Sequence, residues 1–192
     1  MLSVPALRAP ELIIRSDFTP KIDVWAVGCL TFELLVGHYL FNPVDGGKDW
    51  RFEDDHLAKI LELTGEQFSK SILDRAQLRQ EYFNDEGEGE TFNFLFPSPP
   101  LPFLFFCAFA PILNLMLMKF YFFLHKNPGK LLRITDLHPS SIEQELAKYK
   151  LLPTEEIAPA ASFIKACLRL DPSDRPSTRE LEVHPWLRGA FC

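Results

Sequence analysis

Two acidic side chains, Asp55 and Glu62, could each pair with a positive charge. They are seven residues apart in a stretch with helical periodicity, so they share one helix face about 10 Å apart. Successive guanidinium groups on an extended chain could pair with carboxylates at that separation. The alternative is that Asp55 caps its helix and Glu62 is solvated, which is the usual state of an acid on an exposed helix face.

The charge distribution around these acids favours a basic partner. Residues 45–90 hold 13 acids and 6 bases, whereas the whole chain of 192 residues has a net charge of −6. An acidic surface attracts a basic partner, and nucleic-acid-binding proteins usually show the opposite sign, so we expect no direct contact with nucleic acid. A solvated surface without a partner remains an alternative, because most charge runs are of that kind.

The remaining reactive residue types do not form a site. Four cysteines stand far apart, without a CxxC pair or a histidine cluster, which predicts reduced thiols and no metal site. The N-terminus has no long apolar stretch behind a basic start, so we expect no secretory signal. A composition of 47% hydrophobic and 24% charged residues suits one globular domain.

The elements that must position the acids are predicted to be helices. The run 20–36 is apolar on nearly all sides and belongs in the middle of a domain, with Thr19 as its cap and Gly37 as its left-handed exit. Ser177 and Glu180 form a capping box that starts a last short helix. The other predicted helices cover 54–65 (capped by Asp54 or Asp55 and ended by Gly65), parts of 66–83, 140–149 (capped by Ser141) and 154–169 (capped by Thr154).

Asp23 is the one acid near the start of the apolar helix. A carboxylate that is buried there needs hydrogen-bond donors for its lone pairs. The alternative is an ordinary acid near a helix start, exposed to water. The sequence pattern around Asp23 allows both interpretations.

Several motifs together resemble the C-lobe of a protein kinase. "ALRAPE" at 6–11 is similar to the end of a kinase activation segment, and "DVWAVG" at 23–28 is similar to the start of the large central helix. "DPSDRPSTRELEVHPWL" at 171–187 is similar to the family's closing stretch. "GHYLFNP" and "EDDHLAKILELTG" narrow the resemblance to the SR-protein kinases, relatives of the cyclin-dependent and MAP kinases. The resemblance covers roughly residues 5–92 and 127–188, and it implies a mainly α fold, the lower part of a C-lobe without the N-lobe and catalytic loop.

The resemblance also implies roles for individual residues. Glu11 would pair with Arg175 in a buried ion pair. Asp23 would accept hydrogen bonds from the catalytic loop, and Trp25 would have a structural role. Asp55, Glu62 and Lys148 would line a groove that docks Arg-rich peptides. Two residues depart from the family pattern in that groove: His38 stands where the family often has an acid, and Ser140 where it often has a tryptophan.

The motifs that carry phosphoryl transfer are absent from these residues. We find no G-x-G-x-x-G loop, no H-R-D triplet and no D-F-G triplet, and in the family all of them would precede residue 1. We therefore predict no catalytic and no cofactor-binding residues, although the full-length family uses ATP and Mg²⁺. Asp23 would then lack its catalytic-loop partner, and apolar faces that meet the N-terminal half in the family would be exposed.

Residues 92–125 differ from the rest of the chain. The stretch 94–106 contains only Phe, Leu, Pro and Ser, which pyrimidine codons alone can encode, so a translated intron is one interpretation. A genuine family insert is a second, and a membrane span over 103–124 is a third, which Pro111, Asn114 and Lys119 disfavour. We expect two C-lobe parts, 1–91 and 126–192, on either side of this apolar segment, which would be an aggregation hazard.

Two functions follow from the sequence. The first is a fragment of a serine/threonine kinase that acts on Arg/Ser-rich proteins, inactive as it stands and, by resemblance, found in cytoplasm and nucleus. The second is a non-catalytic module that docks basic peptides through the acidic helix.

Overall fold

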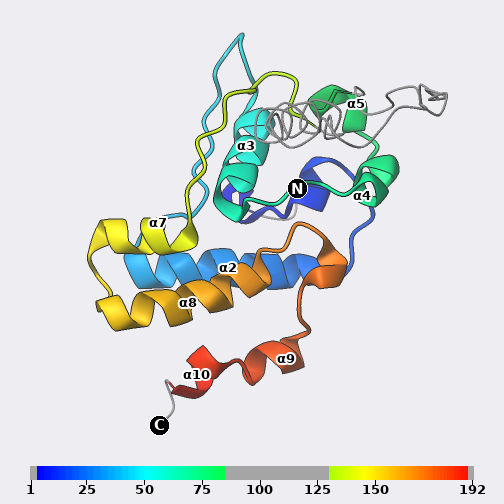
Figure 1. Ribbon diagram of the computed structural model, residues 1–192. Helices are drawn as coiled ribbons and strands as arrows, with labels where there is room; N and C mark the ends of the chain where they lie inside the picture. Colours follow the sequence, from blue (N-terminus) through cyan, green and yellow to red (C-terminus); the bar gives the residue numbers. More distant parts are fainter. Residues whose placement is uncertain (1–3, 85–129, 190–192) are drawn as a thin grey trace, which may run out of the picture.

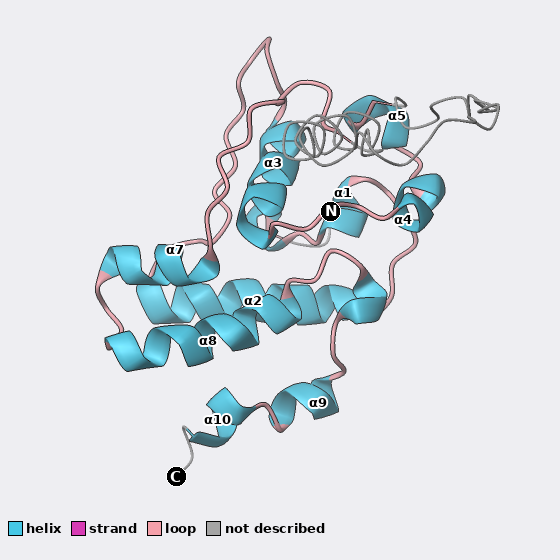
Figure 2. Ribbon diagram, viewed as in Figure 1, coloured by secondary structure: helices cyan, strands magenta, loops and turns pink. Residues whose placement is uncertain are grey.

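The computed structural model describes residues 4–84 and 130–189, which consist of helices joined by loops (Figures 1 and 2). The prediction of a mainly α fold is confirmed. The short elements are η1 (Pro5–Leu7), α1 (Pro10–Ile13), α4 (Lys70–Arg75), α5 (Arg79–Tyr82), η2 (Pro172–Asp174), α9 (Thr178–Glu182) and α10 (Pro185–Gly189). The longer helices are α2 (Lys21–Val36), α3 (Phe52–Thr64), α7 (Ile142–Tyr149) and α8 (Thr154–Cys167).

Helix α2 is the centre of the described fold. It packs against α8 and α7, while α10 covers α8 and α3 meets α1 (Figure 1). The contact between α2 and α8 is close, because a Cβ atom added at Gly28 would lie 2.7 Å from the Cβ atom of Cys167. A larger residue at Gly28 would therefore push the two helices apart.

Most of the predicted helix ends are confirmed. Gly37 ends α2 with a φ of 73°, and both Ser141 and Ser177 form capping boxes with the residues three positions later. The prediction that Thr154 caps α8 is wrong, since Pro153 occupies the N-cap with extended backbone and Thr154 is already helical. Thr19 is not the N-cap of α2 either: Pro20 occupies that position, and the Thr19 hydroxyl accepts a hydrogen bond from the Lys21 N–H at 3.3 Å.

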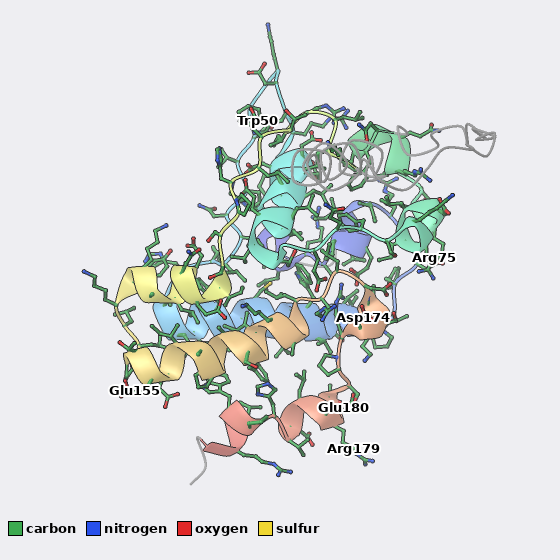
Figure 3. The ribbon with its side chains drawn as sticks, viewed as in Figure 1. Trp50, Arg75, Glu155, Asp174, Arg179 and Glu180 are labelled. Carbon is green, nitrogen blue, oxygen red and sulfur yellow. The ribbon has the colours of Figure 1, made fainter. Side chains whose placement is uncertain are left out.

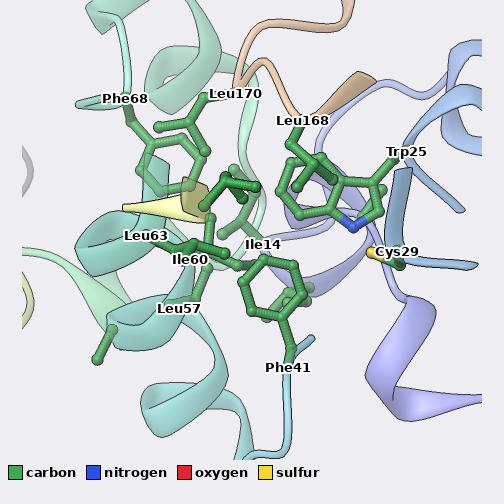
Figure 4. Close-up of a cluster of buried hydrophobic side chains, with 14 of the residues drawn as sticks. Ile14, Trp25, Cys29, Phe41, Leu57, Ile60, Leu63, Phe68, Leu168 and Leu170 are labelled. Carbon is green, nitrogen blue, oxygen red and sulfur yellow. The ribbon is translucent and has the colours of Figure 1, made fainter. Parts of the chain in front are cut away.

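One large hydrophobic cluster joins α2, α3 and the segments around them. Its side chains include Ile14, Trp25, Phe41, Leu57 and Leu168, all of which are almost fully buried (Figure 4). Two free cysteines, Cys29 and Cys167, are also buried, and burial raises the pKa of both thiols, that of Cys167 to about 12. The other two cysteines lie outside the described residues.

The chain leaves and re-enters the described fold at adjacent points. The N–H of Asn84 donates to the carbonyl of Lys130 at 3.0 Å, and the N–H of Leu132 donates to the carbonyl of Tyr82 at 2.9 Å. The apolar segment 92–125 lies outside the described residues, and so does the candidate span 103–124. Within the described residues, none of the helices has the length and apolar character needed to span a bilayer.

Deleting residues 92–125 is expected to leave the described fold intact. Because backbone hydrogen bonds already join 82–84 to 130–132, the shorter connection has no gap to stretch across. Shortening the loop should lower its closure entropy and stabilise the domain by about 1 kcal/mol. Urea unfolding with a sedimentation assay measures both stability and aggregation.

The control for this deletion is a longer one. Removing 82–132 also removes the two backbone hydrogen bonds, and we expect it to be less stable than the 92–125 deletion. Loss of cooperative unfolding in the shorter deletion would contradict the expectation.

Candidate functional site

Helix α3 carries the candidate docking acids and is anchored by Asp54. The carboxylate of Asp54 accepts a hydrogen bond from the Arg51 N–H at 2.9 Å, which closes the first turn of the helix. It also pairs with Arg133 at 2.8 Å and is 1% exposed. The prediction that Asp54 or Asp55 caps the helix is wrong, because α3 starts two residues earlier than expected and Arg51 is the N-cap. Sequence reasoning missed the Asp54–Arg133 pair, whose partners are 79 residues apart.

Asp55 has partners within the chain. Its Oδ2 atom accepts a hydrogen bond from the Val44 N–H at 2.6 Å and from the ammonium of Lys59 at 2.5 Å. The Asp55 side chain is 15% exposed, and that of Lys59 is 35% exposed. The i,i+4 spacing of these two residues is a signal that was available in the sequence.

Glu62 connects α3 to the segment that precedes α7. Its Oε1 accepts a hydrogen bond from the His138 N–H at 2.8 Å, and its backbone carbonyl accepts one from the Ser140 N–H at 3.1 Å. The hydroxyl of Ser140 in turn donates to Glu145 Oε1 at 2.9 Å. These contacts bring Glu62 on α3 close to Glu145 on α7, although the two helices are far apart in the sequence.

Glu62 and Glu145 line a cavity of about 190 Å³ between α3 and α7. Its other lining residues are Leu40, Phe41, Lys59, Leu63 and Ser140. Apolar walls and two carboxylates are a chemically suitable environment for the stem and guanidinium of an arginine side chain.

Lys148 lies on α7, and His38 lies beside that helix. The ammonium of Lys148 is 3.6 Å from Glu145 Oε2, and its side chain is 68% exposed. The ring of His38 stacks on that of Tyr149 with centroids 4.9 Å apart. Neither Lys148 nor His38 is among the residues that line the cavity.

Glu11 and Arg175 form a bidentate ion pair. Arg175 Nη1 and Nη2 donate to Glu11 Oε1 and Oε2 at 2.7 and 2.8 Å. The remaining donors of the guanidinium reach the carbonyls of Arg169, Lys21 and Leu170. The two side chains are 0% and 2% exposed, and all five N–H donors of Arg175 have an acceptor.

Trp25 and Asp23 lie one turn into α2 in opposite environments. Trp25 is fully buried, stacks on Phe41 at 5.7 Å, and receives the Arg175 guanidinium 5.1 Å above its ring. Asp23 is exposed: its backbone N–H donates to the Pro20 carbonyl at 3.1 Å, and its carboxylate has no hydrogen bond or ion pair within the described residues.

The exposed face of α2 continues from Asp23 as an apolar strip. Val27, Leu30 and Leu34 follow at helical spacing and are 41%, 41% and 86% exposed. An apolar face this open is unusual for a central helix, because such a helix normally buries every side.

His56 is a buried histidine that sequence reasoning did not single out. It is 1% exposed between Phe41 and Phe52, and its Nε2 atom has no hydrogen-bond partner within the described residues. Burial lowers the pKa of His56 to about 4, and the nearby positive charge of Arg8 acts in the same direction. Leu57 and Ile60 on the same helix predicted a buried face, from which the burial of position 56 could have been inferred.

The described residues contain no group of three His, Cys, Asp or Glu side chains arranged to hold a metal ion. Among the three acids Asp55, Glu62 and Glu145, the last two line the cavity, whereas Asp55 is not one of its lining residues.

Comparison with known proteins relates the chain to protein kinases in each case given below. A family model of the protein kinase domain matches residues 2–187. The chain is 25% identical over 184 residues to serine/threonine-protein kinase SKY1 of Saccharomyces cerevisiae, which is 96% of this chain and 19% of that protein. It is 29% identical over 180 residues to serine/threonine-protein kinase spk-1 of Caenorhabditis briggsae, covering 94% of this chain and 12% of that protein. It is 37% identical over 81 residues to human SRSF protein kinase 3, covering 42% of this chain and 14% of that protein. The chain thus spans less than a fifth of the length of each relative.

Proposed function

The chain belongs to the protein kinase family, as its motifs predicted, and we propose that this part of the kinase fold binds arginine-rich peptides along α3. The proposed ligand class is the Arg/Ser-rich segment that the resemblance to the SR-protein kinases implies, and SRSF protein kinase 3 is among the relatives of the chain. The whole protein would transfer the γ-phosphate of ATP to serine in such segments, in cytoplasm and nucleus, with Mg²⁺ as its metal.

The observation that carries this proposal is the acidic surface formed by α3 and α7. Asp55 and Glu62 lie on α3, and Glu145 on α7 shares a cavity with Glu62. The walls of that cavity are Leu40, Phe41 and Leu63, which suit the aliphatic part of an arginine. The exposed Lys148 lies beside Glu145 at the edge of this surface and would limit how far the peptide extends.

Neutralising the α3 acids tests the docking proposal. The variant Asp55→Asn plus Glu62→Gln keeps the oxygen acceptors for the Val44 and His138 N–H groups while removing both charges. We expect its affinity for a fluorescein-labelled Arg/Ser-repeat peptide to fall at least tenfold, or about 1.4 kcal/mol, because close interfacial charge pairs contribute that much or more. Fluorescence anisotropy at two salt concentrations measures the affinity and its salt dependence.

A matched variant separates docking from net charge. Glu155→Gln plus Glu156→Gln changes the net charge by the same amount at two exposed positions at the start of α8. Figure 3 labels the first of them, Glu155. We expect it to bind the peptide like the original chain. Equal affinity of the α3 double variant and the original chain would remove the docking proposal.

We further propose that these 192 residues do not transfer phosphate by themselves. Phosphoryl transfer depends on groups that position the triphosphate and its metal ions, and the sequence has no G-x-G-x-x-G, H-R-D or D-F-G motif. Millimolar Mg-ATP should therefore leave the melting temperature unchanged in differential scanning fluorimetry. A dose-dependent upward shift would contradict this proposal, since only a ligand that binds the folded state stabilises it.

A further inference from the structure

The geometry points to Lys59 as an internal competitor for the docking site. Its ammonium pairs with the carboxylate of Asp55 and so weakens the binding of arginine-rich peptides. This inference rests on the proposed function and adds a residue that sets the affinity of the site.

Lys59 lies between the two docking acids on the same face of α3. It follows Asp55 by four residues and precedes Glu62 by three, so the face alternates in sign along the helix axis. Its ammonium is 2.5 Å from Asp55 Oδ2, and its side chain also lines the cavity shared by Glu62 and Glu145. A cation of the chain itself therefore stands where a peptide guanidinium would bind.

Asp55 is occupied on the same oxygen from a second side. The Val44 N–H donates to Oδ2 at 2.6 Å, so this oxygen is satisfied by Lys59 and Val44 together. An incoming arginine must displace the ammonium or compete with its charge at close range. The attraction that Asp55 offers to a cation is reduced in either case.

The carboxylates left for a ligand are those on the α7 side of Lys59. Glu62 uses Oε1 for the His138 N–H, and within the described residues its Oε2 receives no hydrogen bond or ion pair. Glu145 accepts from Ser140 and is 3.6 Å from the exposed Lys148, which is a longer and weaker pair than Lys59–Asp55. One arginine can thus bind beside Glu62 while Lys59 stays in place, whereas a second arginine at Asp55 requires Lys59 to leave.

Lys59 can leave without disturbing the fold. Its side chain is 35% exposed and has a flexible four-carbon stem, so the ammonium can swing toward solvent. The competition is therefore a reversible loss of affinity rather than a permanent block.

The test removes the ammonium and keeps the stem. Lys59→Met is expected to bind an Arg/Ser-repeat peptide about five- to tenfold more tightly than the original chain and with a steeper dependence on salt. The control is Lys165→Met, which makes the same change in net charge. Lys165 on α8 pairs with Glu143 on α7 at 2.6 Å, away from the docking site. Lys165→Met is expected to change the affinity by less than twofold, and Lys59→Arg should keep the original weak binding.

The outcomes separate this inference from the proposed function. If the original chain binds the peptide and Lys59→Met binds no more tightly than Lys165→Met, the competition by Lys59 is wrong while docking stands. If none of the variants binds at physiological salt, docking is wrong and the competition falls with it. A gain confined to Lys59→Met supports both.

Discussion

Replacing Arg175 by methionine is expected to lower the free energy of unfolding by about 3–5 kcal/mol, because it leaves the carboxylate of Glu11 buried without its partner. The guanidinium makes two hydrogen bonds to Glu11 and lies over the Trp25 ring, so one substitution removes an ion pair, three carbonyl contacts and a cation–π contact together. Domains of this size are stable by only about 5–15 kcal/mol, so the variant should be largely unfolded at moderate temperature. Urea denaturation followed by far-UV circular dichroism measures the loss.

Two further variants show whether the loss comes from the unpaired charge. The double variant Glu11→Leu plus Arg175→Met removes both charges, and we expect it to recover part of the stability, since an apolar replacement of a buried pair is often tolerated. Arg179→Met, at an exposed position on α9 (Figure 3), should change stability by less than about 0.5 kcal/mol. An Arg175→Met variant as stable as Arg179→Met would show that the pair contributes little.

Acidification is expected to destabilise the protein through His56 by about 3 kcal/mol between pH 6.5 and pH 4. The pKa of His56 is about 4 in the folded state and 6.5 in the unfolded chain. Above pH 6.5 both states hold neutral histidine and there is no effect. Below pH 6.5 the histidine binds a proton in the unfolded chain but stays neutral in the folded state. The free energy of unfolding therefore falls as the pH is lowered, until the pKa of the folded state is reached. The charged groups that influence His56 are Arg8, Asp55 and Lys59.

Substitution of His56 isolates this contribution. His56→Met has a similar volume and no titratable group, so its free energy of unfolding should depend less on pH in this window than that of the original chain. His138 is exposed, and His138→Gln should retain the original pH dependence. Guanidinium unfolding at pH 7 and pH 4.5 measures the difference. Parallel pH profiles for His56→Met and the original chain would contradict a role for His56.

Local patterns were enough to place most of the helices. The apolar run that became α2, its end at Gly37 and the capping boxes at Ser141 and Ser177 depend on residues within a few positions of one another. The errors are also local: Pro153 displaced Thr154 from a cap, and Arg51 displaced the two aspartates. At these ends several neighbouring residues compete for one position, so a local pattern does not identify the cap.

The candidate site could be predicted only in part. The sequence identified Asp55 and Glu62 as acids on one helix face, and the kinase motifs suggested a pair between Glu11 and Arg175. It did not identify Glu145, whose place beside Glu62 depends on the hydrogen bonds that join Glu62 to His138 and Ser140, just before α7. The spacing of Asp55 and Lys59 did indicate their pair, but the Val44 N–H as a second donor to Asp55 comes from outside α3 and could not be inferred from the helix.

What the sequence alone determined is therefore the longer helices, some of their ends and the family, because these follow from short-range periodicity and motifs. The tertiary structure decided which groups meet: Asp54 with Arg133, Glu62 with the His138 N–H, and His56 with the rings of Phe41 and Phe52. These contacts join residues far apart in the chain or depend on complete burial. Local periodicity identifies the face that is buried but not the group it is buried against, and the pairing of charges depends on that group.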